Sequence, residues 1–297
     1  MSGTMQSLRH RIDGAGDLEG VVRAMKALAA SSIGQYEKAV TSLDDYYRTV
    51  ALGLSVCLRQ AAPASIVKSD GPTGAVVFGS DQGLVGRFNE AVTDLATETL
   101  GKKAGKVRKL WAVGQRVDSL LKDSMQAPAD LFTVPTSVHA ITLLVGKLLV
   151  AIESAREKGE VVNVYVFHNH PKSGSVYEPV CRRLLPLDNA WQNKMAKMPW
   201  PAKSGAPKVR PEAIGGSAAA LDGFIRGYLF VLLFQACAES LNSENASRLA
   251  AMQRAETNIE DILETLNRKF ESVRQASIDE ELFDVVSGFE ALARRKQ

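Results

Sequence analysis

The sequence has few aromatic residues, few cysteines, little net charge and no long uninterrupted apolar run. Aromatic residues make up 6% of the 297 residues, and the formal net charge of +3 gives no reason to expect a nucleic-acid partner. The longest apolar run, Tyr228 to Ala238, is far shorter than the ~20 residues of a membrane span, so we expect any membrane association to be peripheral. Residues 1–13 have no signal-peptide core, and the absence of a transit peptide favours a prokaryotic source, with a processed mature chain as the alternative. Three cysteines without metal-ligand spacing are interpreted as reduced thiols: Cys57, Cys181 and Cys237.

The C-terminal segment, residues 217–297, lacks helix breakers. It contains no proline, and Gly288 is its only glycine after Gly227. Its apolar residues recur mostly at steps of three or four, which predicts one long helix with a narrow apolar stripe, as in a coiled coil. The stripe consists of Leu249, Met252, Ile259, Leu263, Leu266, Phe270, Val273, Ile278, Leu282, Val285, Phe289 and Leu292. Two or three ordinary helices joined near Asn242 and Gly288 are the alternative.

Residues 5–60 form a second long periodic segment. Its apolar residues follow heptad-like spacing, with many small residues that permit a close approach of two helices: Val22, Met25, Ala29, Tyr36, Leu43, Val50, Leu54 and Cys57. The two terminal helices are therefore expected to pair as an antiparallel coiled coil around an inserted domain. Gly14, Gly16 and Gly20 weaken the first turns, so the helix is expected to start near Asp17.

Between these helices the pattern alternates between strands and helices. Strands are expected at 74–78, 107–113 and 161–167, and helices at 89–100, 114–122 and 139–158. This order predicts a small Rossmann-like α/β domain with a mainly parallel sheet. The expected domains are a helix at 1–62, the α/β domain at 63–216 and a helix at 217–297. Residues 189–216 are rich in Pro, Lys and Gly and are expected to form a flexible basic loop.

A glycine-rich turn follows the first expected strand. Gly79, Gly83 and Gly86 lie between a strand and a helix, where a phosphate-binding loop would be found. The spacing fits neither GxGxxG nor GxxxxGK[ST], so the favoured interpretation is a tight turn that requires glycine, with Asp81 inside it. Nucleotide binding is the alternative.

No other cluster predicts an active site. His168 and His170 could bind a metal, but neither a cysteine nor a carboxylate cluster is seen to complete the ligand set, so no metal or other cofactor is expected. Carboxylate pairs such as Asp44 and Asp45 are interpreted as solvated helix faces. The lysines and tryptophans of the 189–216 loop are interpreted as a solvated loop and not as a nucleic-acid site.

Three stretches resemble the gamma subunit of F-type rotary ATP synthases. Residues 22–30 read VRAMKALAA and are similar to the family's TKAMKMVAA, and residues 80–89 read SDQGLVGRFN, similar to SDRGLCGGFN. The third stretch contains SENASRLAAM at 243–252, RQASIDEEL at 274–282 and VSG at 286–288, similar to the family's SEHASRMVAM, RQASITQEL and VSG. The order and spacing of the stretches also fit, and together they span nearly the whole chain.

The resemblance implies a central shaft made of the two terminal helices. Such a shaft would pass through a hexamer of alpha and beta subunits, with the α/β domain at its foot beside the epsilon subunit and the c-subunit ring. The subunit would be non-catalytic, would lie peripherally on the cytoplasmic face of the membrane, and would couple ion flow to ATP synthesis or hydrolysis by rotation. The family pattern implies polar contacts from Arg274, Gln275 and Glu281 to beta-subunit loops. Met25 and Lys26 would face the moving segment of a beta subunit.

The sequence also departs from the family pattern. Gln82 replaces an arginine, Asp279 replaces a threonine, and residues 85–87 read VGR where the family has CGG. These departures favour a divergent branch, such as an alternative, sodium-translocating ATPase, but the ion is chosen in other subunits and both ions stay open. The rival hypotheses are a coiled-coil adaptor with unrelated partners and a nucleotide-binding enzyme. The central stalk of vacuolar-type ATPases lacks the SDQGL turn and fits less well.

Overall fold

The structure is a computed structural model. It describes residues 2–60, 71–102, 107–172, 175–200 and 217–294. The chain divides into two compact units, one made of residues 1–29 and 249–297 and the other of residues 30–248. The long helices α1 (Ser2–Gln60) and α6 (Ser217–Arg294) contribute to both units. The expected domain boundaries after residues 62 and 216 fall within segments outside the described residues and stay a prediction.

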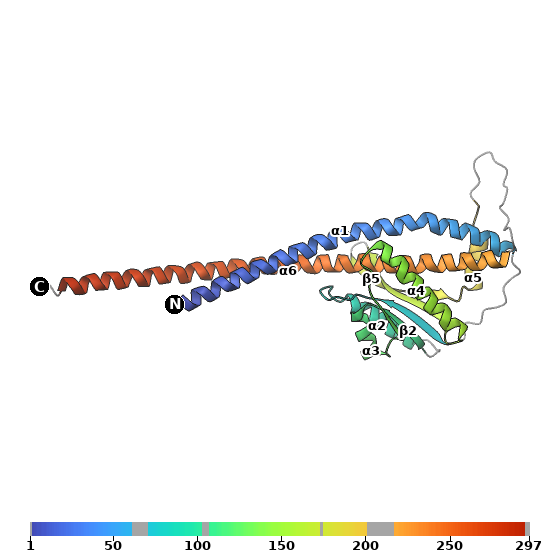
Figure 1. Cartoon of the computed structure of the whole chain (residues 1–297), viewed down its shortest axis with the longest axis horizontal. Coiled ribbons are helices and arrows are strands. Elements are labelled where there is room, and N and C mark those ends of the chain that lie inside the picture. The colour runs from blue at the N-terminus through green and yellow to red at the C-terminus, as the bar shows by residue number, and fades with distance from the viewer. Residues whose placement is uncertain (1, 61–70, 103–106, 173–174, 201–216, 295–297) are drawn as a thin grey trace, which may run out of the picture. The chain divides into compact units, whose positions relative to one another are not determined.

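In the larger unit, α1 and α6 pair antiparallel. Asn242 lies 3.5 Å from Glu37, whereas Phe224, which is earlier in α6, packs against Gly53, which is later in α1. A Cβ atom on Gly53 would lie 2.3 Å from the Phe224 ring, so this close approach requires glycine. The expected antiparallel coiled coil of the terminal helices is confirmed, and the two helices can be followed side by side in Figure 1.

In the smaller unit, the same two helices meet through small and apolar side chains. Ala29 and Met252 are almost fully buried, and the Lys26 ammonium pairs with the Glu256 carboxylate beside them. Helix α1 already begins at Ser2, so the expected start near Asp17 is wrong. Once a helix has formed, each further residue adds one hydrogen bond at little cost, and this offsets the weak propensity of the early glycines.

The sheet of the larger unit has five strands in the order β3-β2-β1-β4-β5. Strands β1 (Thr73–Phe78), β2 (Val107–Val113), β3 (Asp130–Phe132) and β4 (Asn163–Lys172) are mutually parallel where they pair, and β5 (Ser175–Leu185) pairs antiparallel with β4. The expected, mainly parallel sheet is confirmed. The intervening helices are α2 (Phe88–Gly101), α3 (Gln115–Ser124) and α4 (Val138–Glu157).

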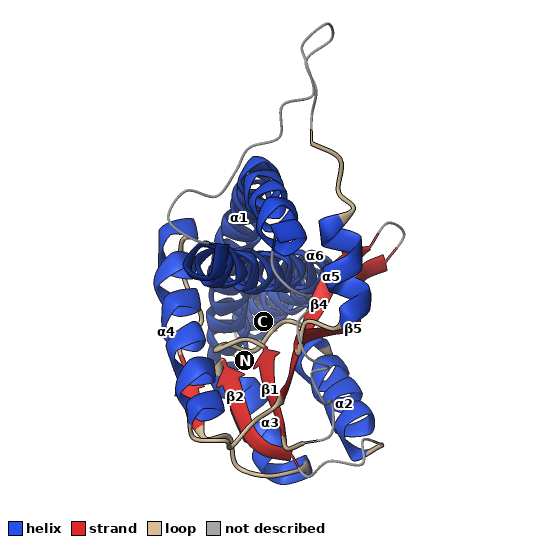
Figure 2. Ribbon diagram, turned by 90° about the vertical axis from the view of Figure 1, so that its right-hand side faces the viewer, coloured by secondary structure: helices blue, strands red, loops and turns tan. Residues whose placement is uncertain are grey.

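Both faces of this sheet are covered. Val76 and Phe78 of β1 face a core formed with α4 and with parts of α1 and α6. Ala75 and Val77 point the other way, into a core formed with α2 and α3. Successive side chains of a strand point to opposite faces, so a continuous apolar run such as β1 indicates a strand buried on both sides. Figure 2 shows α2 and α4 on opposite sides of the strands.

One predicted loop is partly wrong. Residues 189–216 were expected to form a flexible basic loop, but Asn189–Ala196 form helix α5. The Asp188 carboxylate caps this helix by accepting a hydrogen bond of 2.8 Å from the backbone N–H of Trp191, whose indole packs against Tyr228 of α6 at 5.0 Å between ring centroids. Met195 is buried. The segment 201–216 lies outside the described residues.

Among the residues that the structure describes, two helical segments are long and apolar enough to cross a membrane by length and composition: Val138–Glu157 and Ala219–Ser287. Windows of 18 residues within them have mean hydropathies of 1.6 and 1.4, and 39% of each window is buried within the structure. In α4 the buried residues are core residues of the larger unit, such as Ile141, Val145 and Leu148. The apolar character of α4 is therefore explained by its packing on the sheet.

Candidate functional site

The first group of predicted contact residues lies on α1 in the smaller unit. Met25 and Lys26 are both half-buried. The Lys26 ammonium pairs with Glu256 of α6, and the guanidinium Nε of Arg23 lies 3.5 Å from the same carboxylate. These contacts lower the pKa of Glu256, first through the hydrogen bond from Lys26. Lys26 thus has an intramolecular partner, while part of its side chain still reaches solvent.

The second group, Arg274, Gln275 and Glu281, lies further along α6 and is exposed. Arg274 lies 3.7 Å from Glu271, and the Gln275 amide donates a 3.2 Å hydrogen bond to Asp279, so both contact their own helix. At 1.5 Å per residue, Glu256 and Arg274 are about 27 Å apart along α6. The structure therefore does not bring the two predicted groups together.

Large apolar side chains are exposed toward the end of α6. The exposed fraction reaches 62% at Leu282 and 74% at Phe283, and it is also high for Ile278, Val285 and Val286. If the register of the Lys26–Glu256 pair continues, the start of α1 lies opposite about residue 280 of α6. The expected stripe thus continues beyond the length that α1 can cover. Together, Ile278, Leu282, Phe283, Val285 and Val286 are called the α6 apolar end below.

The glycine-rich turn at the end of β1 is held by side chains in the larger unit. The Asp81 carboxylate accepts 3.0 Å hydrogen bonds from the backbone N–H groups of Gln115 and Val134. The Asn89 side chain accepts a 2.9 Å hydrogen bond from the backbone N–H of Ser80. Asp81 thus joins the turn to the first residue of α3 and to the chain after β3.

The glycines of this turn meet different requirements. A Cβ atom on Gly79 would lie 2.5 Å from Val117, and Gly86 has a φ of +60°, which favours glycine. Gly83 has more space, since its nearest neighbour would be the Arg116 guanidinium at 3.4 Å. The backbone oxygen of Val85 accepts a hydrogen bond from Ser247, so the turn also contacts α6.

Replacement of Asp81 by alanine should destabilise the larger unit. Two charge-assisted hydrogen bonds disappear, one of them at the N-terminus of α3, and we expect a loss of about 2–4 kcal/mol in the free energy of unfolding. Urea unfolding followed by tryptophan fluorescence measures this change. The control is Asp123→Ala, an exposed carboxylate on the same helix, for which we expect a change within about 0.5 kcal/mol. Equal unfolding midpoints for the two variants would contradict a stabilising role of the two hydrogen bonds that Asp81 accepts.

A second polar cluster in the larger unit joins β4 to α6. Nε2 of His168 lies 2.8 Å and Nδ1 of His170 lies 2.9 Å from the same oxygen, Oε2, of Glu239. Arg182 of β5 donates a 3.3 Å hydrogen bond to Oε2, and Gln235 donates a 2.7 Å hydrogen bond to Oε1. The expectation that the histidine pair has no carboxylate partner is wrong, since Glu239 meets it from 69 and 71 residues away in the sequence.

Burial and hydrogen bonding set the protonation of this cluster. Desolvation opposes the charged form of Glu239, but hydrogen bonds from both histidines and the charge of Arg182 outweigh it and lower the pKa of Glu239 to about 2. Desolvation lowers the pKa of His168, whose side chain is fully buried. Near neutral pH the cluster therefore contains an ionised carboxylate and a neutral His168 imidazole.

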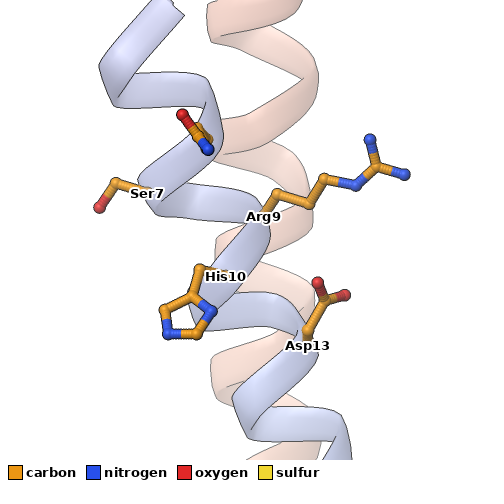
Figure 3. A pocket seen from close by; sticks show the side chains of 5 residues that line it. Ser7, Arg9, His10 and Asp13 are labelled. Carbon is orange, nitrogen blue, oxygen red and sulfur yellow. The ribbon is translucent and has the colours of Figure 1, made fainter.

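A shallow pocket near the start of α1 offers no comparable site. Figure 3 shows that its labelled side chains point to different sides of one helix, with Arg9 and Asp13 on one side and Ser7 and His10 on the other. The lining residues, all from α1, are Gln6, Ser7, Arg9, His10 and Asp13. Side chains that diverge from a single helix do not converge on one ligand.

Comparisons with known proteins identify the family. The chain is 26% identical over 302 residues to the ATP synthase gamma chain of Parafrankia sp. strain EAN1pec, covering 99% of each chain. It is also 26% identical to that of Sorangium cellulosum, covering 97% of this chain and 99% of the other. A family model described as ATP synthase matches residues 4–292. The chain belongs to the family of ATP synthase gamma chains.

Solved structures agree with this gamma-chain fold. The rotor of the Euglena gracilis mitochondrial ATP synthase matches with a TM-score of 0.61 at 14% identity, over 94% of this chain and all of that one. The central stalk and c-ring structure from Tetrahymena thermophila mitochondria matches with a TM-score of 0.53 at 19% identity, over 79% of this chain and 99% of that one. The two structures are 14% and 19% identical to this chain, and they show that it shares their fold.

Sequence reasoning identified this family from its motifs but missed two features of the gamma chain. The role of Glu239 could not be read from its own position, because its histidine partners lie far away in the sequence. The expected apolar stripe includes Ile278, Leu282 and Val285, whereas the structure exposes these side chains. Their position beyond the expected start of α1 was the available signal.

Proposed function

We propose that this gamma chain couples ion flow through a membrane ring to ATP synthesis or hydrolysis by rotating inside a hexamer of alpha and beta subunits. The epsilon subunit and the c-subunit ring are its other proposed partners, and the cytoplasmic face of the membrane its proposed location. A shaft of asymmetric cross-section contacts the three beta subunits differently and biases each toward a different nucleotide affinity. Rotation exchanges these biases, so ion flow and ATP chemistry share one coupling free energy.

The α6 apolar end is the observation that best supports this function. Large apolar side chains exposed on one short length of helix indicate a surface that a partner covers. A bearing formed by subunits around the shaft would cover this surface on all sides of the helix. Exposed apolar side chains such as Phe283 also make few polar contacts, which suits a surface that slides during rotation.

We assign the polar contacts around this surface to specific residues. Arg274, Gln275 and Glu281 are proposed to contact beta-subunit loops, and their exposure in the isolated chain leaves them accessible. Met25 and Lys26 are proposed to face the moving beta-subunit segment. The Lys26–Glu256 pair would hold the lysine in place on the paired helices.

The subunit is proposed to contribute no catalytic group. The glycine-rich turn supports this, because it carries the Asp81 carboxylate, whose negative charge lies in the loop where a phosphate would otherwise bind. An anion held there by the protein itself disfavours a second anion through charge repulsion. The ion that the complex moves is determined in other subunits, and a sodium-translocating branch stays a prediction.

Co-purification tests the proposed function directly. A tag on the N-terminus of the chain, with mass spectrometry of the recovered complex, should yield three alpha and three beta subunits for each copy of this chain. Recovery of the chain alone, or with unrelated proteins, would contradict the rotor function and favour an adaptor role for the helices.

The paired replacement Arg274→Ala and Gln275→Ala should impair coupling without unfolding the chain. Both side chains are exposed, so we expect a change in stability within about 0.5 kcal/mol. We expect ATP-driven ion transport by the assembled complex to fall about tenfold, which corresponds to about 1.4 kcal/mol of lost interaction. Arg268→Ala is the matched control, an exposed arginine on the same helix that lies 3.5 Å from Glu264. Unchanged hydrolysis and transport in the double variant would refute the assigned contacts.

A further inference from the structure

The cluster of His168, His170 and Glu239 has the geometry of a metal site. Residues 168 and 170 are two apart on β4, so their side chains lie on the same face of the strand, toward α6. Glu239 approaches them from α6 within the same unit. The potential ligand atoms all lie within 4.8 Å of one another, with nitrogen–oxygen distances of 2.8 and 2.9 Å.

The ligand types fit a specific class of ion. Two imidazoles and one carboxylate bind Zn²⁺ in many proteins, with metal–ligand bonds of about 2.0–2.2 Å and a fourth position open to water. Tetrahedral ligand atoms at such bond lengths are about 3.4 Å apart. The two nitrogen–oxygen distances between the histidines and Glu239 therefore have to increase by about 0.5 Å to admit the ion. Side-chain rotation can provide this change. Other divalent transition metals accept the same ligands, whereas Mg²⁺ and Ca²⁺ prefer oxygen alone.

The donor atoms of the cluster can take the form that a metal ion requires. Metal binding requires neutral imidazoles and an ionised carboxylate. Nδ1 of His168 has no hydrogen-bond partner among the described residues, so that atom does not fix the ring tautomer. Nε2 is therefore able to exchange its proton for a metal ion.

The surrounding residues provide orientation and access. Gln235 donates its hydrogen bond to Oε1 of Glu239 and leaves Oε2 as the ligand atom, which is the usual outer-shell arrangement around a ligating carboxylate. The side chains of His170 and Arg182 are 38% and 39% exposed, so one side of the cluster is open to solvent. The Arg182 guanidinium now supplies the positive charge that the ion would supply, and its exposed position allows it to move away.

We propose that His168, His170 and Glu239 form a binding site for one divalent transition-metal ion, with Zn²⁺ as the best-fitting class. The ion would replace the protons and the Arg182 contact that now hold the three side chains together. Because the ligands come from β4 and α6, the bound ion would fasten the shaft helix to the sheet within the larger unit. This inference concerns the isolated chain and does not depend on the proposed partners.

Titration of the purified full-length chain with Co²⁺ and Zn²⁺ tests the site. Tetrahedral Co²⁺ gives visible absorption bands, and we expect one equivalent to bind, to be displaced by Zn²⁺, and to raise the melting temperature. A thiolate-to-cobalt charge-transfer band would assign the ion to cysteine and overturn the proposal. His170→Gln removes a partly exposed ligand and should lower the affinity more than about 100-fold, while the protein stays folded.

Two further variants distinguish a metal site from a simple hydrogen-bond network. Arg182→Gln removes the competing cation and should raise the affinity for Zn²⁺ about tenfold, because Glu239 no longer has to release an arginine. His139→Gln, an exposed histidine on α4, should leave binding unchanged. Absence of saturable one-to-one binding to the unsubstituted chain, or binding that His170→Gln does not weaken, overturns the proposal.

Discussion

Gly114→Ala should destabilise the larger unit by about 2–6 kcal/mol, which is the largest loss we expect from the addition of one methyl group to this chain. Gly114 follows β2 and has a φ of +110°. A Cβ atom there would lie 2.7–2.8 Å from backbone atoms of Ser80. The backbone of Ser80 is fixed in turn, because its oxygen accepts a 3.0 Å hydrogen bond from the N–H of Arg116. Neither side of the contact is able to move without breaking the turn.

Gly146→Ala is the matched control for this prediction. Gly146 lies inside α4, and a Cβ atom there would have no neighbour within 4 Å. Alanine is the better helix former, so we expect this variant to gain about 0.5–1 kcal/mol. Urea unfolding followed by tryptophan fluorescence compares the two variants. If Gly114→Ala unfolds at the same urea concentration as the unsubstituted chain, the close contact with Ser80 is not required.

The long helices and the interior strands could be predicted from the sequence because their signals are local. The stripe on α6 and the continuous apolar runs of β1 and β4 each reflect burial. Burial of such an element produces a pattern among residues that are close in the sequence, so the pattern can be recognised without the structure. The antiparallel pairing of α1 and α6 followed from the compact domain inserted between them. The start of α1 at Ser2 could not be predicted from propensity alone, because a helix that has already formed extends through further residues, glycines included, at little cost.

The missed elements are those whose stability comes from distant contacts. Strand β3 has three residues, too few for any periodicity. Strand β5 contains Pro179 and two arginines, which argue against an interior strand, but it lies at an edge where a missing N–H is tolerated. Helix α5 is held by Tyr228 and by Arg59, which donates to the backbone oxygen of its last residue, Ala196, and to that of Met198.

The candidate sites also differ in whether their signal is local in the sequence or depends on distant contacts. The motif around Asp81 and the family of the chain were evident from the sequence, because motif residues keep fixed spacing. The approach of Glu239 to His168 and His170 is a tertiary contact between β4 and α6, and only the fold brings these residues together. The assigned contacts of Arg274, Gln275 and Glu281 involve other chains and stay predictions.

Leu282→Asp combined with Val286→Asp should abolish assembly of the complex while leaving the chain folded. The two side chains are 62% and 48% exposed and lie four residues apart on one face of α6. Their replacement removes no core packing, so the expected cost to the helix is about 0.7 kcal/mol or less per residue. If alpha and beta subunits cover this surface in the complex, each new carboxylate would be desolvated without gaining a polar partner, which costs several kcal/mol.

Recovery of alpha and beta subunits with the tagged double variant should therefore fall by at least about tenfold, since 1.4 kcal/mol already accounts for that factor. Leu282→Met combined with Val286→Ile is the matched control, because it keeps both side chains apolar and similar in volume. Circular dichroism of the isolated chains verifies that both variants remain helical. Equal recovery for the two variants would show that the α6 apolar end is not covered in the assembled complex. If recovery of alpha and beta subunits falls only for the aspartate variant, the α6 apolar end is the surface that the hexamer covers.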